Sequence, residues 1–171
     1  MADGWNGRSW SVQPSHVAYP PLQSFTAVAC TSPNACTATG SGETGGDDPP
    51  FPIVARWNGK NWSAKDPAIT GEGSVISGVS CTTDARCTAV GTQYGPFGDD
   101  PPAPLAERWQ GDRWSIQRTV TPANPPGTSQ NGAHATGSLN SVSCLTPSAC
   151  TAVGDFSTPS GQSETLIERY R

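Results

Sequence analysis

A motif of the form Trp-x-Gly-x-x-Trp-Ser occurs three times in this chain of 171 residues, and it constrains the fold more than any other feature. The copies begin at Trp5, Trp57 and Trp109 and read WNGRSWS, WNGKNWS and WQGDRWS, with 52 residues from one start to the next. Regular self-similarity of this kind is typical of repeat architectures, in which each copy forms one structural unit. We therefore expect a single repeat domain.

Two further motifs recur in the same order. Cysteine pairs stand between the Trp motifs, in CTSPNACTA, CTTDARCTAVG and CLTPSACTAVG, and the triplets ARW, ERW and ERY complete each repeat. These motifs divide the domain 1–171 into repeats at about 5–56, 57–108 and 109–171. A period of about 50 residues is typical of β-propellers and related arrays.

The turns within one repeat separate four short segments that have the character of strands. In the second repeat unit they are Ser74 to Cys81, Cys87 to Gln93, Pro104 to Trp109 and Trp114 to Gln117. The Asn-Gly pairs of the first two Trp motifs favour tight hairpins, because both residues tolerate positive φ. The 19 glycines and 17 prolines also favour turns over helices. Each repeat is thus predicted to be a four-stranded antiparallel meander, the blade of a propeller.

The repeat also resembles known sequences. The Trp-x-Gly-x-x-Trp turn is similar to the Asp-box turn of sialidase-type propellers, with Trp where that family has Asp. The whole repeat, WNGxxWS with CxxxxxCTAVG and ERW, resembles repeats of largely uncharacterised actinobacterial proteins. This resemblance covers nearly all of the chain and implies an all-β propeller fold, but it brings no catalytic residue with it.

The six cysteines form three pairs, each enclosing five residues at the turn between the first and second strands. Opposite ends of a tight hairpin bring Cα atoms within the roughly 4.4 to 6.8 Å that a disulfide needs. We predict three local disulfides, Cys30–Cys36, Cys81–Cys87 and Cys144–Cys150. Zinc is the alternative, but it needs two cysteine pairs facing one ion, and here the pairs lie on separate repeats.

Disulfides indicate an oxidising compartment, so we expect a secreted or extracytoplasmic protein. The first residues, MADGWNGRSW, lack the basic and apolar regions of a signal peptide, and a cytoplasmic location stays open. The net charge is -4 and no basic residues cluster, so we expect no nucleic acid partner. No apolar stretch approaches the roughly 20 residues that span a bilayer, so we expect no membrane partner.

The long irregular segments all fall on loops that share one end of the predicted meanders, and loops of this kind carry function. Two of these segments contain the related sequences GGDDPPFP and FGDDPPAP. Their carboxylates suit hydrogen bonds to sugar hydroxyls or a calcium ion, which takes about six to eight oxygen ligands. A plain solvated turn stiffened by proline is the alternative. The candidate ligand-binding residues of this loop end are Asp47, Asp48, Asp99, Asp100, Tyr19, Tyr94, Phe97 and His134.

We predict a ligand-binding propeller, most simply a lectin-like protein that binds carbohydrate at the loop end. The alternative is a propeller enzyme, a hydrolase, lyase or natural-product cyclase, with calcium as a candidate cofactor. Its candidate catalytic residues are His16, His134, Asp99 and Asp100. A structural interaction protein is a third class. No linear catalytic motif is present, but propeller enzymes assemble their sites from several blades and leave none.

The repeated aromatic and basic positions are expected to be structural. Trp5, Trp57 and Trp109 occupy matched positions of a hairpin, where burial between repeats is the simplest role. Arg56, Arg108 and Arg169 precede the aromatic of the triplets and are expected to pair with a neighbouring repeat.

Counting strands leads to an expectation about assembly. Three blades are too few for a ring, since propellers close with about four to eight. We therefore expect a homodimer of six blades. The chain opens on a fourth strand at 10–13 and closes on a third strand at 166–170, which can accept the opening strand of a partner. Thr26, Ser77 and Asn140 occupy equivalent first-strand positions and would line the central channel.

Overall fold

A computed structural model of the chain has an all-β fold, in agreement with the sequence. It describes residues 2–14, 22–43, 45, 49–68, 73–94, 102–120, 136–158 and 160–170. Within these ranges thirteen strands form four antiparallel sheets. The same ranges contain no helix long and apolar enough to cross a membrane.

Two of the sheets are complete four-stranded meanders. Sheet 1 consists of β3 (Leu22–Ser32), β4 (Ala35–Glu43), β5 (Phe51–Trp57) and β6 (Trp62–Lys65), hydrogen-bonded in that order. Sheet 2 repeats this arrangement with β7 (Ser74–Thr83), β8 (Arg86–Gln93), β9 (Ala103–Trp109) and β10 (Trp114–Gln117). The four-stranded unit predicted from the turns is therefore confirmed.

The sheets at the two ends of the chain have fewer strands. Sheet 3 consists of β11 (Thr136–Thr146), β12 (Ala149–Ser157) and β13 (Ser163–Tyr170), and the N-terminal hairpin consists of β1 (Ala2–Trp5) and β2 (Trp10–Gln13). Trp5 faces Trp10 in the hairpin as Trp57 faces Trp62 between β5 and β6. The hairpin thus corresponds to the third and fourth strands of a sheet. β1 was not predicted, because its sequence, ADGW, lacks the Arg-aromatic pair of the other third strands.

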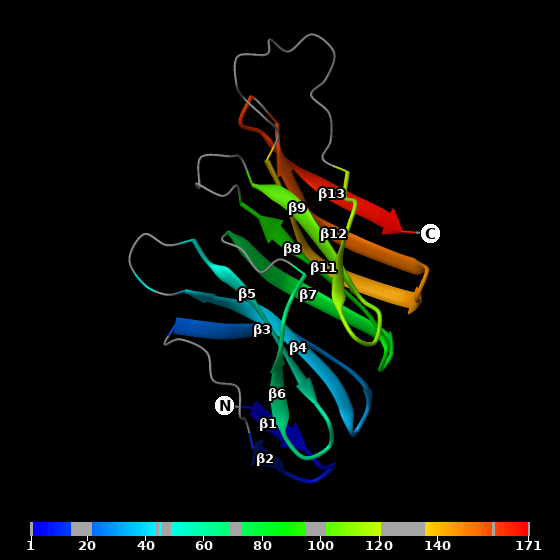
Figure 1. Ribbon diagram of the computed structural model, residues 1–171. Helices are drawn as coiled ribbons and strands as arrows, with labels where there is room; N and C mark the ends of the chain where they lie inside the picture. The colour runs from blue at the N-terminus through cyan, green and yellow to red at the C-terminus, as the bar shows by residue number, and fades with distance from the viewer. Residues whose placement is uncertain are drawn as a thin grey trace.

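The sheets follow one another so that their first strands lie side by side (Figure 1). β3 contacts β7, and β7 contacts β11. One apolar cluster lies between sheets 1 and 2 and contains Val54, Ile76, Val79, Cys87, Ala89, Trp109 and Trp114. A second lies between sheets 2 and 3 and contains Val90, Leu139, Val142, Cys150, Ala152 and Leu166. The core is therefore divided between the sheets, with no helical layer over the described strands.

The tryptophans of the repeat follow this packing. Trp57 and Trp109 are buried, as expected, with 9% and 5% of their surface exposed. Trp5 is 54% exposed, so its expected place in the core is wrong. The reason is its position in a two-stranded hairpin, which has no first and second strands of its own to cover the indole.

Each first strand carries a β-bulge at the same position. The extra residues are Thr26, Ser77 and Asn140. The residue of the second strand at each bulge is glycine, namely Gly40, Gly91 and Gly154. A Cβ on Gly91 would collide with the carbonyl oxygen of Val75, because the bulge bends the first strand over the second. The last residue of the CTATG and CTAVG motifs is therefore set by a close backbone approach.

All three predicted disulfides are present, and no cysteine is free. In each pair the two cysteines face each other directly in the strand register, with Cα atoms 4.0 Å apart. The strands continue beyond the cysteines, so the turn of sheet 2 is the pair Asp84-Ala85 rather than the five residues that separate Cys81 from Cys87. A register shift between Cys81 and Thr83 accommodates the extra residue.

Each disulfide closes a small loop, so it should stabilise the fold only moderately. Replacement of both Cys81 and Cys87 by serine is expected to lower the free energy of unfolding by about 2 kcal/mol, the chain-entropy value for so short a loop. Denaturant unfolding monitored by Trp fluorescence measures this loss. Complete unfolding of the variant in buffer would contradict the local role of the disulfide.

The bulge predicts a larger effect for Gly91→Ala. The new methyl group meets backbone rather than a movable side chain, and relief requires a shift of β7, so the free energy of unfolding should fall by about 3 kcal/mol. Arg86→Ala, an exposed change on the same strand, is the control and should cost less than about 1 kcal/mol. Equal stability of the two variants in denaturant titrations would refute the steric explanation.

Candidate functional site

Most of the loop residues predicted to bind ligand or to act in catalysis lie outside the described residues. These are Asp47, Asp48, Asp99, Asp100, Tyr19, Phe97, His16 and His134. Tyr94 is described and half-buried, directly after β8. Its backbone N–H donates to the carbonyl of Gly73 at 2.6 Å, which ties the ends of β7 and β8 together.

Two of the loop segments end in the same kind of backbone hydrogen bond, which we call an anchor. The carbonyl of Pro50 accepts hydrogen bonds from the N–H groups of Gly73 (3.1 Å) and Ser74 (3.0 Å), at the start of sheet 2. The carbonyl of Pro102 accepts one from Gly137 (2.8 Å), at the start of sheet 3. Pro50 and Pro102 are the last residues of the two Asp-Asp-Pro-Pro sequences. Each such segment is therefore joined to the first strand of the following sheet. Sequence reasoning identified the motif but not this bond, because backbone acceptors leave no compositional signal.

Two of the first-strand bulge residues, Thr26 and Asn140, have different environments. The hydroxyl of Thr26 donates to the carbonyl of Ile76 at 2.8 Å, so it links β3 to β7. Asn140 is exposed, and its amide donates to the carboxylate of Asp155 at 3.0 Å. The hydroxyl of Ser138 donates to the same carboxylate at 3.0 Å. Ser138, Asn140 and Asp155 thus form a small polar cluster on the open face of sheet 3.

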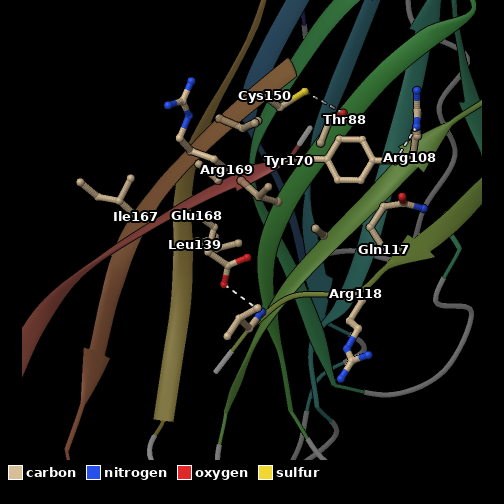
Figure 2. Close-up of a pocket in the computed structure, with 15 residues that line it drawn as sticks. Thr88, Arg108, Gln117, Arg118, Leu139, Cys150, Ile167, Glu168, Arg169 and Tyr170 are labelled. Carbon is tan, nitrogen blue, oxygen red and sulfur yellow. Dashed lines mark hydrogen bonds between the residues drawn. The ribbon is translucent and has the colours of Figure 1, made fainter. Parts of the chain in front are cut away.

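A cleft of about 300 Å³ lies between sheets 2 and 3. Figure 2 shows Leu139 and Glu168 of sheet 3 on one side of it and Arg108 and Gln117 of sheet 2 on the other. No strand covers β13 within the described residues, so the cleft remains open beside that strand.

Glu168 has a pKa shifted by its surroundings. Burial in the cleft wall raises the pKa of Glu168, and the hydrogen bond from the N–H of Val120 at 3.2 Å opposes that rise. Glu107 occupies the same position of sheet 2, where it is fully buried and accepts from the N–H of Ala68 at 3.2 Å. The two glutamates therefore make the same inter-sheet contact, with Glu168 less covered.

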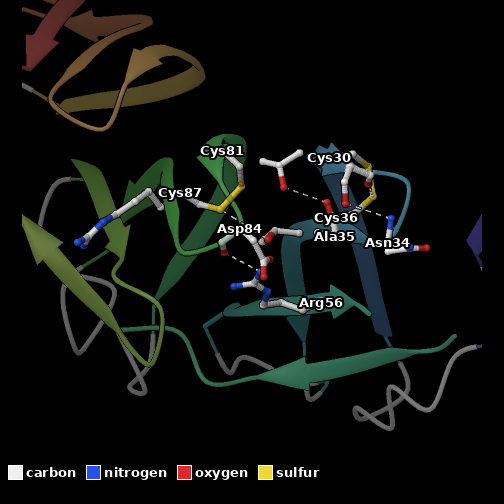
Figure 3. Close-up of polar contacts among 12 residues, drawn as sticks. Cys30, Asn34, Ala35, Cys36, Arg56, Cys81, Asp84 and Cys87 are labelled. Atoms are coloured by element: carbon white, nitrogen blue, oxygen red, sulfur yellow. Dashed lines mark hydrogen bonds and ion pairs between the residues drawn. A yellow bond between two sulfur atoms is a disulfide. The ribbon is translucent and has the colours of Figure 1, made fainter. Parts of the chain in front are cut away.

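Two of the three third-strand arginines, Arg56 and Arg108, contact the next sheet as expected. Arg56 pairs with Asp84 (Figure 3) and lies over the ring of Trp109 at 5.2 Å. Arg108 donates to the carbonyl of Pro147 at 2.7 Å and lies over Tyr170 at 5.5 Å. Arg169 makes no such contact with the described residues.

The described residues do not bring together three or more metal-binding side chains. The candidate calcium residues, Asp47, Asp48, Asp99 and Asp100, fall outside that search. Calcium therefore stays a prediction from the sequence.

Comparisons with known proteins add no assignment. No family model matches the chain, and no curated protein matches it. The functional argument rests on the features of the chain itself.

The environment of Glu168 predicts a pH effect. A carboxyl group whose folded pKa is raised holds its proton to higher pH in the folded state, so wild-type stability should fall as pH rises above about 4.5 toward neutrality. Glu168→Gln keeps an oxygen that can accept from Val120 but cannot ionise, and it should lack this loss. Glu164→Gln, an exposed change on the same strand, controls for net charge. Parallel stability curves for wild type and Glu168→Gln between pH 4 and about 7 would contradict the effect.

Proposed function

We propose that the chain is a ligand-binding protein of the β-propeller type, in which sheets 1, 2 and 3 are blades and the ligand is a carbohydrate bound at the loop end. Support for the blades comes from the meander order of the sheets and from first strands that lie side by side. The resemblance to sialidase-type and actinobacterial repeats points the same way. The three disulfides favour a secreted protein.

The observation that carries the ligand site is the pair of anchors at Pro50 and Pro102. Each fixes the end of an Asp-Asp-Pro-Pro segment against the next sheet, at the same place in two successive repeats. A binding site gains affinity when its polar groups are held before the ligand arrives. Proline adds to this by restricting φ in the segment.

Carbohydrate is the ligand class that the residue types of these segments favour. Sugar hydroxyls are bound by carboxylate and amide groups, and the apolar faces of sugars pack on aromatic rings. The loop segments carry both kinds of group, the two aspartate pairs and the aromatic residues Tyr19, Tyr94 and Phe97. The net charge of -4 and the absence of a basic run in the sequence disfavour anionic polymers as ligands.

A glycan array probed with the full chain tests this proposal, followed by calorimetry with the best glycan. Asp47→Ala/Asp48→Ala and Asp99→Ala/Asp100→Ala should each weaken binding at least about tenfold, the effect of losing one or two charged hydrogen bonds. Their unfolding curves should match wild type.

Lys60→Ala and Asp112→Ala are matched controls, because both lie in Trp-motif turns at the opposite end of the sheets. Neither should change glycan affinity. Loss of binding in these controls but not in the aspartate variants would refute the site. No glycan binding together with a stoichiometric calcium ion would favour the enzyme alternative instead.

A further inference from the structure

The two ends of the chain expose apolar side chains that the repeat buries elsewhere. Trp10 of β2 is 69% exposed, whereas Trp62 of β6 and Trp114 of β10 hold the same position and are 7% and 6% exposed. All three begin a fourth strand with the sequence Trp-Ser. Within the described residues, β2 is therefore a fourth strand paired only with β1, and sheet 3 has three strands and no fourth.

We propose that two copies of this chain form a reciprocal dimer, in which β2 of each copy pairs along β13 of the other and places Trp10 in the cleft between sheets 2 and 3. This inference goes beyond ligand binding and rests on the repeated packing of the sheets. It explains three separate features of the chain ends, namely the cleft, an unused acceptor and an unstacked arginine.

The cleft has the shape of an interface from which one side chain is missing. Between sheets 1 and 2 the space beside Ile76 and Val79 is filled by Trp109 and Trp114, whose rings are tilted relative to each other with centroids 5.7 Å apart. Between sheets 2 and 3, residues Leu139, Val142 and Tyr170 hold the positions of Ile76, Val79 and Trp109 and line the cleft. Among the described residues, none holds the position of Trp114 in sheet 3. Trp10 of the partner subunit is the side chain that the repeat places there.

An acceptor for the indole N–H is also in place. Nε1 of Trp62 donates to Oε1 of Gln13 at 2.9 Å, across the gap between the N-terminal hairpin and sheet 1. The next sheet has Lys65 at the position of Gln13, and Nε1 of Trp114 has no hydrogen-bond partner among the described residues. In the fourth strand of sheet 2 the corresponding residue is again a glutamine, Gln117, which lines the cleft.

Among the described residues, Gln117 forms side-chain hydrogen bonds only through its amide nitrogen. Its Nε2 donates to the carbonyl of Ile116 at 3.1 Å. Oε1 accepts no hydrogen bond from the described residues, so it is available to an indole N–H. We assign it to Nε1 of Trp10 of the partner subunit.

The proposed dimer also gives the exposed Arg169 of β13 an aromatic partner on the other copy. Arg56 and Arg108 each lie over the third-strand aromatic of the following sheet, Arg56 over Trp109 and Arg108 over Tyr170. Arg169 lies over no aromatic ring among the described residues. Trp57 of sheet 1 lacks a preceding arginine, because β1 has Gly4 at that position. When β13 of the partner takes the place of β1, Arg169 of the partner subunit lies over Trp57.

The sheet faces that would meet in the dimer, on sheet 1 and sheet 3, also carry exposed apolar side chains. Phe25 and Val28 on sheet 1 are 43% and 62% exposed, while Ile76 and Val79 at the same positions of sheet 2 are 0% and 9% exposed. On sheet 3, Val153 and Ile167 are 44% and 66% exposed, whereas Val90 of sheet 2 and Val54 of sheet 1 at the corresponding positions are buried. Sheet 1 of one copy and sheet 3 of the other therefore form the two halves of one more inter-sheet interface. Two such contacts close the pair with twofold symmetry and cover both free edges.

β1 competes with the partner strand in this arrangement. It pairs with β2 in the same register that β13 would use, with Trp5 opposite Trp10. The indoles of this pair lie 5.6 Å apart but both stay largely exposed, so β1 covers Trp10 poorly. Weakening β1 should therefore strengthen the dimer.

Sedimentation equilibrium of the full chain tests the proposal. Wild type at micromolar concentration should have about twice the 17.7 kDa chain mass. Trp10→Ala should raise the dimer dissociation constant at least about thirtyfold, the effect of losing an interface hot spot. Trp5→Ala, the matched control on the facing strand, should leave this constant unchanged or lower it. Ile116→Ala, an exposed change on β10, should have no effect.

Two further variants guard against a Trp10→Ala protein that fails to fold. Gln117→Ala and Arg169→Ala remove only polar contacts, and each should weaken the dimer about five- to tenfold, the worth of one hydrogen bond or cation–π contact. A monomeric wild type at concentrations up to about 100 μM, where an interface of standard size is occupied, would overturn the proposal. Masses beyond two chains, or equal weakening by Trp5→Ala and Trp10→Ala, would also overturn it. Glycan binding by a monomer would refute the dimer and leave the proposed function intact.

Discussion

Packing of one thin sheet against the next is the interaction on which the rest of this structure depends. Only 34% of the residues are apolar, and the buried ones gather in clusters between neighbouring sheets. A sheet of four short strands cannot bury enough surface alone, so each repeat relies on its neighbour. The indoles of Trp109 and Trp114 supply much of the area in the cluster between sheets 1 and 2, because aromatic side chains bury more surface than aliphatic ones.

The polar contacts between the sheets follow from this packing. Arg56 of sheet 1 is partly buried under sheet 2, which provides Trp109 as its partner. Glu107 of sheet 2 is fully buried and accepts from the backbone N–H of Ala68, which follows sheet 1. The disulfides have a different task, since each links two strands of one sheet and none joins two sheets. Their loss should therefore affect a turn more than the order of the sheets. The anchors at Pro50 and Pro102 join the loop end to this framework without covalent bonds.

The sequence predicts which residues make up the candidate site, but not the backbone hydrogen bonds that hold its ends in place. The repeated Asp-Asp-Pro-Pro sequences are visible in the chain, and they identify the loop end as the place where polar residues recur. That Pro50 accepts hydrogen bonds from Gly73 and Ser74 could not be predicted, because any residue can supply a backbone carbonyl. The cleft beside Leu139 and Glu168 was missed for another reason. It lies beside β13, the edge strand of sheet 3 within the described residues, and the space left at a sheet edge has no sequence signal of its own.

Local patterns by themselves determined the strands, the turns and the cysteine pairs of this protein. The hairpin between Cys81 and Cys87 follows from neighbouring residues, and the limits of β2 and β10 agree with prediction to the residue. Burial was decided only by the tertiary structure. Trp5 and Trp109 belong to the same motif, yet Trp109 is buried and Trp5 is exposed, because one lies between two sheets and the other lies on a two-stranded hairpin. A motif specifies the conformation of a strand and its turn, whereas the burial of a side chain depends on which sheet packs against it.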